Sequence, residues 1–214
     1  MMAVPKRSAF TATDGRAAQP LTDDASIIEA MQRWVRRAVI GLKLCPFAKS
    51  VESHGQVRYI VSRQHRLAGI LEDLEREACC LQRAEPALHD TTLLILAEGQ
   101  AEFLEFHFTV GEAERRLRAL KLDGELQLAS FHPHYVFADA QPDDIGNYTN
   151  RAPWPTLHLL REASIDKAVA AIADPAEIYE RNMQTLHALG AAGWERLMRD
   201  EGPEGELHTK KGAA

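Results

Sequence analysis

Three short apolar runs alternate along the chain with longer segments in which apolar residues recur at helical spacing. The runs are VRYIV (57–61), TTLLILA (91–97) and ELQLASF (125–131), and their β-branched and aliphatic residues predict buried strands. Between them, apolar residues lie three and four positions apart over 67–81 and again over 101–120, which predicts helices. The resulting βαβαβ order predicts an α/β fold with a small, mostly parallel sheet and right-handed helical crossovers.

Further helices are expected at both ends of this core, packed on the sheet. Apolar residues recur at helical spacing over 27–42, and Pro46 disfavours helical geometry at the residue before it, so a first helix should end near Leu44. A short second helix can follow from Pro46. A last long helix should begin with the capping sequence DPAE (174–177) and stop at Gly190.

Composition and charge favour one soluble domain. The segments 1–22 and 201–214 lack periodicity and are typical of mobile tails, which leaves a single domain over 23–200. The formal net charge of −6 lacks the basic excess of nucleic-acid binders, and no apolar stretch has the length of a membrane span. The three cysteines form no disulfide framework, which favours the cytoplasm. A homodimer is common enough among such proteins to be expected.

The main candidate for a functional site is the irregular segment 131–156, which follows the third predicted strand. It contains four prolines, and loops of this length in compact domains are often functional. His132 should stand at the carboxyl edge of the sheet, where open α/β folds bind ligands. A helix is expected next, over LHLLREA (157–163). This loop and helix gather the polar residues His132, His134, Tyr135, Asn150, Arg151, His158, Arg161 and Glu162.

Two kinds of chemistry fit the histidines and the glutamate. His158 and Glu162 are four residues apart and would share a face of the expected helix. Together with His132 they would supply ligands suited to a divalent transition metal such as zinc, iron or manganese. The alternative is that the two histidines transfer protons without a metal, or only hydrogen-bond within the loop.

Two arginines predict an anion site in the same segment. Arg151 and Arg161 would flank the proline-led start of the expected helix, where free backbone N–H groups favour an anion. With Asn150 and Tyr135 nearby, they would bind a small carboxylate or phosphate. The alternative is that the arginines form structural ion pairs with local acidic residues.

Cys45 is a further candidate, as a nucleophile or as a wall residue of the site. At the C-terminal end of the first helix its thiol would be inert. At the N-terminal end of the second helix, before Pro46, the positive end of the helix dipole would favour the reactive thiolate.

Three segments resemble a bacterial family known as domain of unknown function 1415. They are LCPFAK (44–49), LASFHPHY (128–135) and TNRAPWPTLHLLREAS (149–164). The resemblance spans about 31–194 and implies a stand-alone, soluble bacterial domain, without pointing to a particular activity. His134 falls at a position that the family pattern leaves open, so a metal site would depend on His132, His158 and Glu162.

Two functional hypotheses follow from these residues. The first is a cytoplasmic enzyme, a hydrolase or transferase, that acts on a small anionic metabolite. In it, His132 and His158 act as acid and base groups or as metal ligands. Arg151 and Arg161 would bind the anion, and Glu162 would orient a histidine. The second hypothesis is a non-catalytic module that recognises an anion or another protein.

Overall fold

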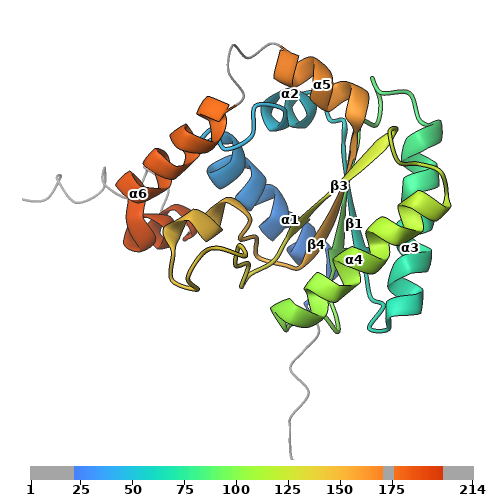
Figure 1. Ribbon diagram of the computed structural model, residues 1–214, viewed down its shortest axis with the longest axis horizontal. Coiled ribbons are helices and arrows are strands. Elements are labelled where there is room, and N and C mark those ends of the chain that lie inside the picture. The colour runs from blue at the N-terminus through green and yellow to red at the C-terminus, as the bar shows by residue number, and fades with distance from the viewer. Residues whose placement is uncertain (1–21, 171–175, 200–214) are drawn as a thin grey trace, which may run out of the picture.

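A four-stranded sheet between two layers of helices makes up the part of the chain that the computed structural model describes, residues 22–170 and 176–199 (Figure 1). One face carries α3 (Leu67–Arg83) and α4 (Phe103–Ala119). The other face carries helices from both ends of the chain, as predicted. These are α1 (Asp24–Trp34), η1 (Val35–Ile40), α2 (Ala48–Ser53), α5 (Glu162–Ala170) and α6 (Ala176–Met198).

The three predicted strands are confirmed, and a fourth strand corrects the predicted sheet. The strands are β1 (Val57–Ser62), β2 (Thr91–Leu96), β3 (Leu126–Phe131) and β4 (Thr156–Arg161). The segment expected to form a helix from 157 is therefore a strand as far as Arg161, and helix begins only at Glu162. Because β4 runs antiparallel between β2 and β3, in the order β1-β2-β4-β3, the sheet is mixed and mostly antiparallel instead of mostly parallel.

Although the sheet is mixed, the carboxyl ends of three strands still meet at one edge, where His132 was expected. β1 pairs parallel with β2, and β3 runs in the same direction because both β2 and β3 are antiparallel to β4. The carboxyl ends of β1, β2 and β3 thus share one edge. His132, directly after β3, lies at that edge, as predicted.

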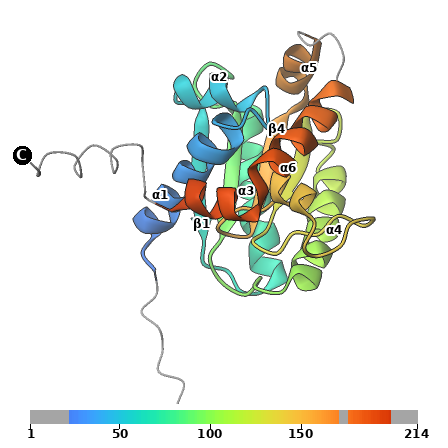
Figure 2. The same cartoon turned by 90° about the vertical axis from the view of Figure 1, so that its left-hand side faces the viewer.

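The two faces of β4 divide its side chains between two cores. Leu157 and Leu159 pack with α3 and α4, while Leu160 packs on the opposite face with α2 and α5. On that second face, α1, η1 and α6 enclose a separate cluster around Leu93 and Ile95. Turned by 90°, the molecule shows α6 lying across this face (Figure 2). None of the described helices is both long and apolar enough to cross a membrane.

The first helix ends in a π-helical segment. The Gly41 N–H donates to the Arg36 carbonyl at 3.0 Å and the Leu44 N–H to the Val39 carbonyl at 2.9 Å, both across five residues. The α-helix ends at Trp34 and the π-helical segment at Ile40, both before the predicted end near Leu44, although the last helical hydrogen bond reaches Leu44. The predicted short helix is confirmed as α2.

At the other end of the chain, the helical run from Ala176 stops at Gly190, as predicted, and a second helical stretch follows within α6. The φ of 62° at Gly190 produces a kink, after which helical structure continues to Met198. Glycine tolerates this left-handed conformation because it lacks a Cβ atom. Asp174 and Pro175 of the predicted cap lie outside the described residues, as do the predicted tails apart from Thr22.

Candidate functional site

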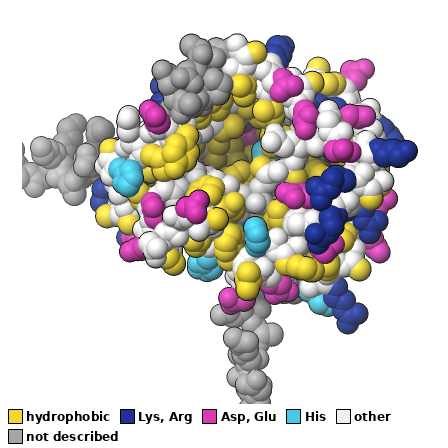
Figure 3. Space-filling view, in the orientation of Figure 1, with side chains coloured by type: hydrophobic (Ala, Val, Ile, Leu, Met, Phe, Trp, Pro, Cys, Tyr) yellow, Lys and Arg dark blue, Asp and Glu magenta, His cyan; other side chains and the backbone are white. Residues whose placement is uncertain are grey.

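An apolar cavity of about 170 Å³ lies between the sheet and the helices η1, α2 and α5. Most of its lining side chains are aliphatic or aromatic, and Cys45, Thr91 and His158 are also among its lining residues. On the face of the molecule seen in Figure 3, hydrophobic side chains gather around a hollow. Pockets of this kind, mainly apolar with a few polar groups, are typical of small-molecule sites.

The cavity lies between two hydrophobic clusters on the same face of the sheet. One cluster joins α1, η1 and α6, and the other joins α2 and α5 to β4. Val35 and Val39 of the π-helical segment line the gap. Short π-helical segments often occur at functional sites, and here one forms part of the cavity wall.

His158 presents an unprotonated nitrogen to this cavity. Its Nε2 lies 2.7 Å from Thr91 Oγ1, and the Thr91 hydroxyl donates to the Leu159 carbonyl, also at 2.7 Å. Because the hydroxyl proton is already used, Thr91 Oγ1 must accept from Nε2–H, which leaves Nδ1 as a free acceptor. Nδ1 has no hydrogen-bond partner among the described residues. Burial lowers the pKa of His158 to about 4, so the ring is neutral at pH 7.

Cys45 lines the same cavity from the turn before α2. Burial raises the pKa of its thiol, and backbone N–H groups of Ala48 and Phe47 counteract that rise. The neighbouring Leu44 carbonyl accepts from Asn182 Nδ2 of α6 at 2.9 Å, which fixes the turn. The thiol thus lies at the start of the second helix, as in the reactive alternative, but burial keeps it protonated.

His132 lies apart from this cavity and has both ring nitrogens occupied. Its Nε2 donates to the Gln100 carbonyl at 3.0 Å, and its Nδ1 accepts from the His134 N–H at 3.0 Å. The side chain is fully buried, and burial lowers its pKa. His132 lines a different hollow, of about 230 Å³, beside the loop after β2. It therefore ties the carboxyl ends of β2 and β3 together.

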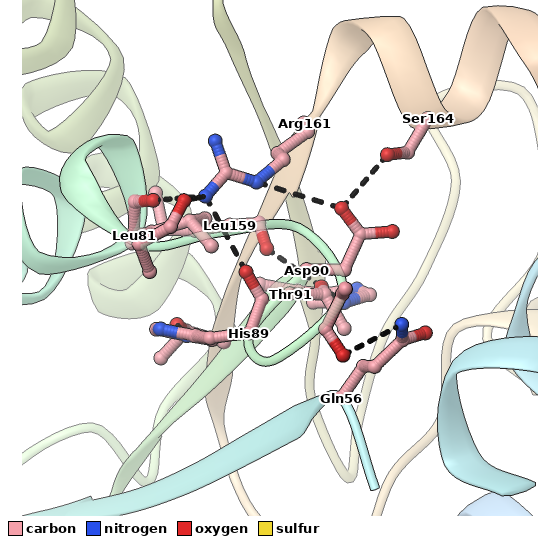
Figure 4. Close-up of polar contacts among 12 residues, drawn as sticks. Gln56, Leu81, His89, Asp90, Thr91, Leu159, Arg161 and Ser164 are labelled. Carbon is pink, nitrogen blue, oxygen red and sulfur yellow. Dashed lines mark hydrogen bonds and ion pairs between the residues drawn. The ribbon is translucent and has the colours of Figure 1, made fainter. Parts of the chain in front are cut away.

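Arg161 is bound by backbone carbonyls (Figure 4). Its Nη2 donates to the carbonyls of Leu81, Ala84 and His89, and its Nε lies 3.5 Å from Asp90 Oδ1. Ser164 donates to the same Asp90 oxygen at 2.8 Å. The guanidinium thus joins β4 to the end of α3 and to the loop before β2.

Arg151 and its predicted neighbours also bind the protein itself. Arg151 donates to the carbonyls of Tyr135 and Pro142 and lies over the Tyr148 ring, 4.4 Å from its centroid. Asn150 Nδ2 donates to the Ser130 carbonyl at 3.1 Å. These contacts fit a structural role for the arginines better than an anion site. Most of the partners are backbone carbonyls, however, and not the carboxylates of the predicted ion pairs.

The predicted metal ligands do not meet. His158 belongs to a strand and Glu162 begins α5, so they do not share a helix face. His132 and His158 line different hollows. Within residues 22–170 and 176–199, no group of three or more His, Cys, Asp or Glu side chains is arranged to hold a metal ion.

Fold and cavity together define an α/β protein with a small-molecule type of pocket whose wall carries a thiol and an imidazole. The family model described as protein of unknown function (DUF1415) matches residues 26–196, and the chain belongs to this family. Comparison with curated proteins and with solved structures gives no match. Each of the three segments that carry the family resemblance contributes side chains to the cavity: Cys45 and Phe47, Ala129 and Phe131, and His158 and Leu160.

Proposed function

We propose that this protein binds a small, uncharged and mainly apolar molecule in the cavity between the sheet, η1 and α2. The supporting observation is the composition of the cavity wall, which is apolar except at a few points. A dry cavity of about 150 Å³ lined by aliphatic and aromatic side chains can bind benzene, so about 170 Å³ is enough for a small ring or a short chain.

The free Nδ1 of His158 adds a preference within this class of ligand. A ligand that carries one hydrogen-bond donor gains a partner that a hydrocarbon lacks. The neutral wall disfavours an anion, because no lysine or arginine of the described residues lines the cavity and burying an unpaired charge is costly. An uncharged ligand therefore replaces the anionic metabolite of the sequence-based hypothesis.

Binding of phenol and benzene tests the proposal. Both should raise the melting temperature, because a ligand that binds only the folded state stabilises it by mass action. Phenol should stabilise more than benzene in the wild type, and this difference should vanish in His158→Phe.

A matched pair of variants locates the binding. Ala129→Leu places a larger side chain on the cavity wall, and Ala119→Leu makes the same change at an exposed position at the end of α4. Phenol should stabilise Ala119→Leu as it does the wild type and leave Ala129→Leu unaffected. Equal stabilisation of both variants, or none of the wild type, would contradict the proposal.

A further inference from the structure

The polar groups on the cavity wall include a nucleophile and a base, which makes the cavity suited to covalent chemistry. Cys45 and His158 both line it, from the turn before α2 and from β4. The thiol is protonated in the free protein and needs a base to become nucleophilic. His158, which lines the same cavity and has an unprotonated Nδ1, can supply such a base.

Thr91 fixes the imidazole in the tautomer that this role requires. Its hydroxyl donates to the Leu159 carbonyl and accepts from Nε2–H, so the lone pair of His158 must be on Nδ1. A nucleophile, a base and a third group that orients the base form the arrangement typical of thiol and hydroxyl enzymes. Here Thr91 is the positioning residue.

A second feature of the wall points to the kind of ligand. The indole N–H of Trp34 is buried and has no acceptor among the described residues, and Trp34 lines the cavity. The residue itself is 2% exposed. A buried donor without an acceptor is costly, and a ligand with a carbonyl oxygen offers the missing acceptor. A carbonyl compound also provides an electrophilic carbon for the thiol.

We propose that Cys45 attacks the carbonyl carbon of a small, uncharged acyl ester or thioester bound in the cavity, with His158 as the base. This inference rests on the proposed binding function. The Sγ–C bond forms, the bond from the carbonyl carbon to the leaving alcohol or thiol breaks, and the thiol proton passes through Nδ1 to the leaving group. Water then adds to the thioester. The C–S bond breaks, the carboxylic acid leaves, and the sulfur regains a proton.

Acetylation by p-nitrophenyl acetate tests this step on the full chain. Intact mass and peptide mapping should place one acetyl group on Cys45, together with a burst of p-nitrophenolate. Cys45→Ser should lose the burst, whereas Cys80→Ser, at an exposed cysteine, should keep it. Replacement of the base in His158→Asn should slow acetylation by about 100-fold, the usual size of a general-base contribution.

The positioning role of Thr91 has its own readout. Thr91→Val keeps the shape and removes the hydroxyl, so acetylation should slow while phenol still binds. Thr91→Ser should restore the rate, because it returns the hydroxyl that orients His158. If Thr91 were only structural, Thr91→Val and Thr91→Ser would be acetylated at equal rates as long as they bound phenol equally well.

The outcomes distinguish this inference from the binding function. If phenol binds but acetyl groups appear only on Cys79, Cys80 or lysines, the covalent step is refuted and the binding function stands. Equal rates of Cys45 acetylation in the wild type and in His158→Asn would also refute it. If phenol does not bind to the wild type, both proposals fail.

Discussion

Replacing His158 by leucine should remove a large part of the acid sensitivity of this protein. In the unfolded chain the imidazole takes up a proton near pH 6.5, whereas burial lowers the folded-state pKa to about 4. Between these values the unfolded state binds more protons, so the free energy of unfolding falls as the pH falls. Since each pKa unit corresponds to 1.36 kcal/mol, His158 alone should cost the wild type about 3 kcal/mol by pH 4.

Urea unfolding of the wild type and His158→Leu, at several values from pH 7.5 down to pH 4, measures this contribution. At pH 7.5 the variant lacks the hydrogen bond to Thr91, which sets a constant offset. His132 and His89 also have pKa values lowered by burial, so they steepen the pH dependence in both proteins and cancel in the difference. Between pH 7.5 and pH 4, the difference in unfolding free energy between His158→Leu and the wild type should therefore shift by about 3 kcal/mol in favour of the variant. Parallel pH profiles would refute the assigned burial of the imidazole.

Three other perturbations test the surrounding structure. Gly41→Ala should lower the unfolding free energy by about 1–3 kcal/mol in urea, because a Cβ atom would lie 2.2 Å from the Arg37 carbonyl oxygen; an unchanged midpoint would contradict the π-helical ending. Arg161→Met should cost about 3 kcal/mol or more, since it leaves Asp90 and buried carbonyls without their cation. Arg115→Met on the exposed side of α4 serves as its control and should stay within about 0.5 kcal/mol of the wild type. Treatment with EDTA should leave the melting temperature unchanged, because the predicted metal ligands do not meet; a clear fall would reinstate a metal site.

The strands and helices that the sequence predicted correctly have strong local patterns. β2 is an apolar run buried along its whole length, and α3 has a continuous apolar stripe. β4 was missed because Leu157 and Leu160 also fit helical spacing, and a strand buried on both faces does not alternate with period two. Its position between β2 and β3 depends on pairing partners far away in the chain.

The candidate site likewise combines residues that the sequence indicated with an arrangement that it did not. Cys45 and His158 were identified from the sequence as reactive residue types, but their common cavity depends on β4 and the π-helical segment. Thr91 carried no signal, because a threonine at the start of an apolar strand is an ordinary strand former. The partners of Arg161 are mostly backbone carbonyls, which a sequence pattern cannot reveal.

The cavity also has an energetic consequence for the fold. At about 24 cal/mol per Å³, leaving about 170 Å³ unfilled gives up at most about 4 kcal/mol of stability. A protein of this size has only about 5–15 kcal/mol in total, so such a void is expected where function requires the space. Ala129→Leu should therefore be more stable than the wild type while failing to bind phenol. Lower stability together with intact binding would mean that the space around Ala129 is already filled and that the ligand binds elsewhere.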